Sequence, residues 1–160
     1  MPYTGILHIA TPSDREVVLT RDFDAPRRLV FDALTKPELL KRWMEAPGRI
    51  FHLCEIDFKV GGAYHFVWRG EGKKDVGMRG VYREIVPGER IGTTEEWDDW
   101  DAGETLATTT LADQGGKTIL TIVSLFPSKQ VRDSVLKSGL EKGAKANYDK
   151  LDAVLGELMR

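Results

Sequence analysis

The sequence predicts an α+β fold, in which an antiparallel sheet of about seven strands lies between two short helices and one long C-terminal helix. Three observations support this prediction. The middle of the chain alternates apolar and polar residues with a period of two, which is typical of half-buried strands. Short connections rich in glycine, proline and aspartate separate these segments and favour pairing of consecutive strands. After Pro127 the strand pattern stops and helical spacing begins.

The length of 160 residues is typical of a single domain. We expect an N-terminal arm over residues 1–15, which carries at most a short edge strand, and one domain over residues 16–160.

The segment Arg21–Trp43 carries the first strand into the two short helices. Asp24 stands directly before Ala25–Pro26, a combination of acidic cap and early proline that predicts a helix start. Pro37 opens a second short helix, which we expect to end near Trp43. This places the two helices between the first and second strands, where they could cover one end of the sheet.

The expected strands are bounded by turn residues such as Gly61–Gly62 and Gly115–Gly116. They cover Glu16–Asp24, Ile50–Lys59, Ala63–Arg69, Val76–Val86, Arg90–Trp97, Glu104–Leu111 and Lys117–Leu125.

A helix of close to 30 residues is expected from Ser128, a favourable cap, to Leu158. The inward stripe of this helix is bulky at both ends and small in the middle, around Gly139, Gly143 and Asn147. A glycine inside a helix costs about 1 kcal/mol relative to alanine. The small centre therefore needs a compensating reason.

Composition excludes several classes of protein. The chain carries 23 basic and 25 acidic residues, a balance that argues against a nucleic-acid-binding surface. Cys54 is the single cysteine, so an intramolecular disulfide is impossible. We expect no signal peptide, no membrane insertion and a cytoplasmic location.

The main candidate site is a cavity between the sheet and the long helix. Aromatic and apolar residues share one face of consecutive strands and would oppose the small helix centre. They could interdigitate with the glycines and fill the space, or the glycines could leave room for a flat or elongated apolar molecule. The lining residues we expect are Tyr64, Phe66, Trp68, Met78, Tyr82, Trp97 and Asn147, with Trp43 at the rim.

Charged residues are expected near the same interior: Arg21, Glu55, Asp57 and Glu95. A buried charge is usually paired, which favours a structural role. The alternative is a polar anchor for a ligand or a general acid/base.

The histidines and the acidic stretch after Glu96 are weaker candidates for a functional site. His8, His52 and His65 have no metal-ligand spacing, so we expect no metal and no cofactor. The acidic stretch from Trp97 to Asp101 predicts a polar hairpin tip with an exposed Trp100.

An ordered set of short phrases resembles the START-like, or SRPBCC, superfamily, and within it the branch named after the activator of the heat-shock-protein-90 ATPase. The resemblance covers roughly residues 16–158 and implies a helix-grip fold, in which a curved antiparallel sheet grips the C-terminal helix. It implies an apolar ligand between sheet and helix in many relatives, and no shared catalytic motif. The co-chaperone that names the branch carries a preceding domain, so a direct co-chaperone role is not expected of these 160 residues. The phrases are RDFDAP (21–26), VFDALTKP (30–37), Trp43, Asp57 with Gly61–Gly62, GVYREIVPGER (80–90), GGKT (115–118) and SGLEKG (138–143).

These observations favour a domain that binds a small hydrophobic or amphipathic molecule and is not an enzyme. Two alternatives stay open. One is a cyclase, aromatase or dehydratase that acts on a polyketide-like substrate through Glu55, Asp57 or Glu95. The other is an interaction module for a chaperone or other protein, or a homodimer, which uses the outer sheet face or Trp100.

Overall fold

The computed structural model describes residues 3–46 and 48–160. Its elements are β1 (His8–Ala10), β2 (Glu16–Phe23), α1 (Arg27–Thr35), α2 (Pro37–Leu40), β3 (Ile50–Ile56), β4 (Ala63–Arg69), β5 (Val76–Val86), β6 (Arg90–Trp97), β7 (Trp100–Gln114), β8 (Lys117–Leu125), α3 (Lys129–Lys137) and α4 (Leu140–Leu158).

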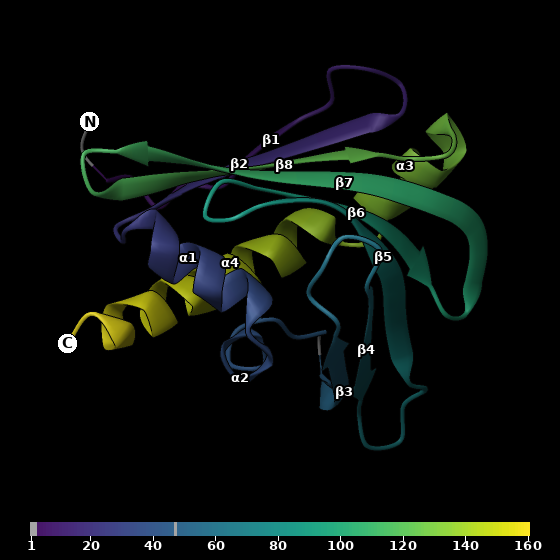
Figure 1. The fold of residues 1–160 in the computed structure, drawn as a ribbon. Helices are drawn as coiled ribbons and strands as arrows, with labels where there is room; N and C mark the ends of the chain where they lie inside the picture. The colour runs from purple at the N-terminus through teal and green to yellow at the C-terminus, as the bar shows by residue number, and fades with distance from the viewer. Residues whose placement is uncertain (1–2, 47) are drawn as a thin grey trace.

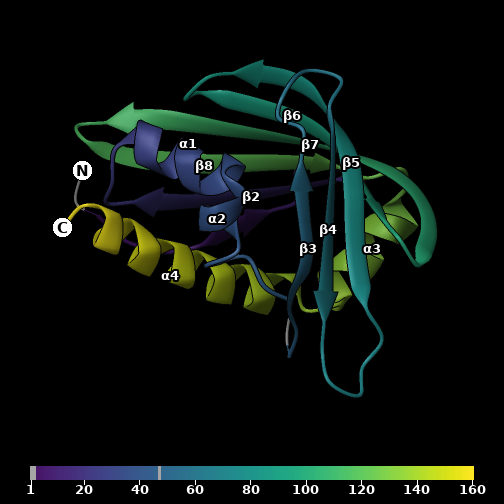
Figure 2. The same cartoon turned by 60° about the horizontal axis from the view of Figure 1, so that its bottom comes forward.

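All eight strands form one antiparallel sheet in the order β1-β2-β8-β7-β6-β5-β4-β3. The sheet curves strongly, so that β3, β4 and β5 stand at a steep angle to β2 and β8 (Figures 1 and 2). Helices α1, α2 and α4 lie on its concave side (Figure 2). This is the α+β helix-grip arrangement predicted from the sequence. None of the described helices is both long enough and apolar enough to cross a bilayer.

The predicted strand count was low by one, because residues of the N-terminal arm form the edge strand β1. It pairs with Val18–Thr20 of β2. Asp22 accepts hydrogen bonds from the backbone N–H groups of Thr4 and Gly5 at 2.7 and 2.8 Å. Burial alone would raise the pKa of Asp22, but hydrogen bonds from Thr4 and Gly5 outweigh it and leave that pKa lowered. The arm is thus tied to the sheet by its backbone.

The start of α1 differs from the prediction in its cap. Pro26, not Asp24, occupies the N-cap position, and no side chain caps the helix. The carbonyl oxygen of Pro26 accepts the first hydrogen bonds of the helix, from the N–H groups of Leu29 and Val30. By contrast, the predicted cap of the C-terminal helix is present, since the Ser128 hydroxyl accepts a hydrogen bond from the Val131 N–H at 3.1 Å.

The expected single C-terminal helix is in fact two helices. Gly139 has a φ of 91°, in the left-handed region, and ends the continuous helix between α3 and α4. Glycine adopts this conformation without steric penalty. Gly143 lies within α4, and a methyl group placed on it would meet no atom within 4 Å. The two glycines therefore have different roles.

Alanine substitutions at these glycines are expected to change stability in opposite directions. Gly139→Ala should lower the free energy of unfolding by about 1–2 kcal/mol, because a left-handed φ strains a residue with a Cβ. Gly143→Ala should raise it by about 0.5–1 kcal/mol through helix propensity. Urea denaturation of both variants measures the difference. A shift of the same sign in both would contradict these backbone assignments.

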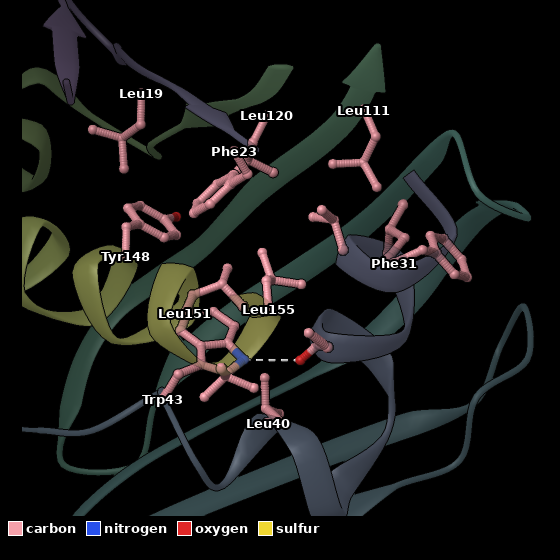
Figure 3. Close-up of a cluster of buried hydrophobic side chains, with 14 of the residues drawn as sticks. Leu19, Phe23, Phe31, Leu40, Trp43, Leu111, Leu120, Tyr148, Leu151 and Leu155 are labelled. Carbon is pink, nitrogen blue, oxygen red and sulfur yellow. Dashed lines mark hydrogen bonds between the residues drawn. The ribbon is translucent and has the colours of Figure 1, made fainter. Parts of the chain in front are cut away.

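The main core joins β2 and β8 to α1 and α4. Phe23, Leu120, Leu151 and Leu155 are almost completely buried there. Figure 3 shows these side chains together with Tyr148 and Trp43 between the sheet and the helices. The core fixes the C-terminal half of α4 against the sheet and so determines where its N-terminal half lies.

Candidate functional site

Inward-facing aromatic residues of β4 and β5 form one continuous cluster. The side chains pack ring against ring, with centroids 5.1 Å apart for Tyr64–Phe66 and 5.6 Å for Tyr64–Tyr82. Phe51 of β3 extends the cluster and lies 4.9 Å from Trp68. Five of the predicted lining residues are brought together here and are at most 6% exposed: Tyr64, Phe66, Trp68, Met78 and Tyr82.

Hydrogen bonds fix two of these rings. The Tyr64 hydroxyl donates to the Thr94 carbonyl oxygen at 2.5 Å, and the Trp68 indole N–H donates to the Met44 carbonyl oxygen at 3.2 Å. Gly80 makes room for Tyr64, since a Cβ on this glycine would lie 2.6 Å from the tyrosine hydroxyl. Burial raises the pKa of Tyr64 well above its usual range, and the nearby Glu95 raises it further. Tyr64 is therefore a neutral, positioned group.

Glu95 lies on the same concave face, in the middle of the sheet. It pairs in register with Thr105 of β7, which is 7% exposed, while the next pair, Thr94 and Leu106, belongs to the outer face. Burial raises the pKa of Glu95 to about 7. Its side chain nevertheless keeps partial contact with solvent. Within the described part of the chain, this carboxylate has no hydrogen bond and no ion pair.

Tyr148 of α4 faces this region from the helix side. Its ring stacks on Trp43 and meets Phe23 edge-on, both with centroid separations of 6.0 Å. Burial and the Glu95 carboxylate raise the pKa of Tyr148 above its usual range. Its hydroxyl has no hydrogen-bond partner among the described residues. Sequence reasoning missed Tyr148, although the stripe that contains Leu151 and Leu155 places it on the inward face of α4.

Gly143 lies one helical turn before the predicted lining residue Asn147 and on the same side of α4. Asn147 itself is half-buried and bonded to Glu45, accepting from its N–H at 3.3 Å and donating to its carbonyl oxygen at 3.2 Å. Asn147 therefore ties α4 to the segment after α2, next to the open space at Gly143.

Two predicted site residues lie outside the aromatic cluster. Trp97 is 39% exposed and, with Trp100, lines a polar surface hollow of about 150 Å³ at the β6–β7 hairpin. It ends β6 directly before a tight turn, at the periphery of the sheet. Trp43, expected at a rim, is 5% exposed, and its indole N–H donates to the Ala33 carbonyl oxygen at 2.9 Å (Figure 3). Its surroundings are those of a core residue.

The four charged residues expected near the interior differ in burial and in pairing. Arg21 is 3% exposed and donates to Asp149 at 3.1 Å and to the Asp22 carbonyl oxygen at 2.7 Å, as expected of a buried charge. Glu55 and Asp57 are exposed. Glu95 is thus the one member of the predicted set that is both inward-facing and unpaired within the described residues.

The histidines stay apart from this region. His65 lies 2.7 Å from Asp98, in an ion-pair cluster with Arg79 on the exposed side of the sheet. Among the described residues, no group of three or more His, Cys, Asp and Glu side chains is placed to hold a metal ion.

Comparison with known proteins decides the family. The family described as "Activator of Hsp90 ATPase homolog 1-like protein" matches residues 24–156. The chain belongs to this family. Its solved relatives include a protein of Rhodobacter sphaeroides, with 28% identity, a TM-score of 0.89, and coverage of 95% of this chain and 99% of that one.

Two further solved members of this structural group support the same fold. A Chromobacterium violaceum protein shares 27% identity with a TM-score of 0.75, and covers 89% of this chain and 98% of its own. A Nitrosomonas europaea protein shares 20% identity with a TM-score of 0.82, and covers 93% and 99%, respectively. No curated protein matches the chain. Membership of the Hsp90 ATPase activator-like family supports a ligand-binding or activator-like domain. The choice between these two roles depends on the residues of the candidate site.

Proposed function

We propose that this chain binds a small hydrophobic or amphipathic molecule between the concave face of the sheet and the N-terminal half of α4. The observations that carry this proposal are the open space beside Gly143 of α4 and the cluster of aromatic side chains on the concave sheet face. A helix that only had to pack would gain about 1 kcal/mol from alanine at this position. Mostly apolar surfaces with a few polar groups are typical of small-molecule sites.

Several inward-facing residues of the sheet are partly exposed to solvent, which supports a ligand site on its concave face. Thr93, Ile122 and Ser124 point toward the helices by strand alternation, yet they keep contact with solvent. On the helix side, Leu140 and Ala144 are also only half-buried. The C-terminal half of α4 contrasts with this, since Leu151 and Leu155 are at most 1% exposed. The partly exposed residues of the sheet and of the N-terminal half of α4 are therefore those we expect to line the ligand site.

Filling this space tests the proposal. The uncharged dye N-phenyl-1-naphthylamine, which fluoresces in apolar surroundings, should bind the wild-type protein at micromolar concentrations. Gly143→Leu should weaken this binding by about tenfold or more, because the new side chain occupies the space of a ligand of similar volume. Fluorescence titration measures the affinity.

Gly156→Leu is the matched control, since Gly156 also lies in α4 and a Cβ there meets no atom within 4 Å. Both variants gain helix propensity, so a general effect on the helix would appear in both. The control should bind the dye as the wild type does. Equal binding by Gly143→Leu and Gly156→Leu would contradict the proposed location.

A second candidate function rests on Glu95 alone. A carboxylic acid with a pKa of about 7 suits general acid or base catalysis at neutral pH. This is the cyclase, aromatase or dehydratase alternative, now without Glu55 and Asp57, which face solvent. Turnover of a polyketide-like substrate that is lost in Glu95→Gln would support it, and binding without turnover would favour the first function.

A further inference from the structure

Glu95 differs from Arg21, the buried charge on the concave face, in having no partner among the described residues. Arg21, near one end of the sheet, is held by Asp149 and by a backbone carbonyl oxygen. Glu95, at the centre, has neither an ion pair nor a hydrogen bond within the described residues. The Glu95 carboxylate is half-buried and still reached by solvent, and a partly desolvated carboxylate gains from pairing with a cation. A ligand that enters the concave face could supply this cation.

The groups around Glu95 suit a cation. The hydroxyl of Tyr64 on β4 donates a hydrogen bond to the carbonyl oxygen of Thr94, the residue directly before Glu95. The Glu95 carboxylate also contributes to the raised pKa of Tyr148 on α4. Tyr82 of β5 lies next to Tyr64, and Thr105 of β7 is the register neighbour. No positive charge among the described residues offsets the burial of Glu95. A carboxylate bordered by aromatic rings attracts an ammonium group through charge and through the ring faces.

Resting on the proposed function, we propose that the ligand of the concave face is a hydrophobic amine, whose protonated nitrogen pairs with Glu95 between Tyr64 and Tyr148. A ligand carboxylate would be repelled at this position. A neutral ligand would bury the carboxylate further and leave it unpaired. The apolar part of the amine would lie along the aromatic cluster toward Gly143.

An ion pair between Glu95 and an ammonium group predicts that the affinities for charged and for neutral ligands depend on pH in opposite directions. The titratable groups that face Glu95 are Tyr64, Tyr82 and Tyr148, and burial keeps all three neutral near pH 7. Glu95 therefore controls the charge of the site in this range. Affinity for an amine should rise from pH 6 to pH 8, as Glu95 ionises. Affinity for a neutral analogue should fall over the same interval, because its binding favours the protonated acid.

Calorimetric titration with two matched probes tests the inference. The probes are 1-naphthylmethylamine, which is protonated at pH 8, and the neutral 1-naphthylmethanol of similar shape. We expect the amine to bind the wild-type protein about tenfold or more tightly than the alcohol at pH 8. Glu95→Gln should bring the two affinities within about threefold by weakening the amine alone. Glu96→Gln, which removes an exposed neighbouring carboxylate, should retain the wild-type preference.

The outcomes separate the two proposals. Binding of both probes with equal affinity, or a preference for the amine that survives in Glu95→Gln, would overturn the cation assignment and leave the proposed function intact. Absence of binding by both probes and by N-phenyl-1-naphthylamine would overturn both.

Discussion

Replacing Glu95 by glutamine should stabilise the folded protein at pH 8 by about 2–3 kcal/mol, although the substitution removes a charged group. The pKa of Glu95 is raised from its ordinary value of 4.5 to about 7 in the folded state. Each unit of difference corresponds to about 1.4 kcal/mol, and solvent that reaches the carboxylate screens part of the total. Glutamine cannot ionise and avoids this cost.

The sign of the pH dependence follows from the direction of the shift. Between pH 4.5 and 7 the folded state holds the Glu95 proton more tightly than the unfolded chain does. The contribution of Glu95 to the free energy of unfolding of the wild type is therefore most favourable below pH 4.5, and it is lost as the pH rises to 7. Glu95→Gln should match the wild type within about 0.5 kcal/mol at pH 4.5 and exceed it at pH 8.

Urea denaturation at the two pH values measures this difference. Glu96→Gln is the control, because Glu96 is adjacent, its side chain is 40% exposed, and it pairs with Arg79 at the surface. Its effect should stay within about 0.5 kcal/mol at both pH values. If Glu95→Gln were as stable as the wild type at pH 8, the carboxylate would be fully solvated or paired within the protein, and the cation site would lose its basis.

Trp43→Ala should lower the free energy of unfolding by about 3–5 kcal/mol, the usual cost of deleting a large buried aromatic side chain. The substitution removes the stacking with Tyr148 and leaves the Ala33 carbonyl oxygen without the indole donor. Because Trp43 holds α1, the segment after α2 and α4 together, we expect thermal unfolding to shift downward by roughly 10 °C.

Two other tryptophan variants are the controls for this loss of stability. Trp43→Phe keeps an aromatic ring and should lose less than half as much stability. Trp100→Ala removes a side chain that is 40% exposed and should change stability by less than about 0.5 kcal/mol. A Trp43→Ala variant as stable as Trp100→Ala would show that Trp43 acts as a movable cover and not as part of the core.

The sequence predicted the sheet well because the turns are chemically distinct. The bounds of β4, β5, β6 and β8 agree with the predicted segments, and the turns between them are rich in glycine, proline and aspartate. The bounds of β7 do not. It begins at Trp100, because the hairpin turn is confined to Asp98–Asp99.

The break in the C-terminal helix and the positions of Trp43 and Trp97 could not be predicted from local sequence, because they depend on tertiary structure. Gly139 and Gly143 look alike in a helical pattern, and only the backbone angle distinguishes the one that ends α3 from the one inside α4. Trp97 shares the parity of the cavity residues but lies at the end of its strand. Trp43 follows a helix whose packing direction the sequence does not define.

For the candidate site, the sequence indicated which aromatic residues share a face, but not which carboxylate faces inward. Alternation alone placed Tyr64, Phe66 and Tyr82 on one face. Glu55, Asp57 and Glu95 could not be ranked without the strand register and the position of α4. It is the pairing of Glu95 with Thr105, opposite Tyr148, that separates it from the other two.

The most direct test of the account is the location of a bound hydrophobic amine. Amide chemical shifts recorded by NMR during addition of 1-naphthylmethylamine should change most at Tyr64, Glu95 and Gly143, which border the concave face from three different elements. Shift changes confined to the β6–β7 hairpin, around Trp100 and Asp101 in the polar surface hollow, would contradict a binding site between the sheet and α4.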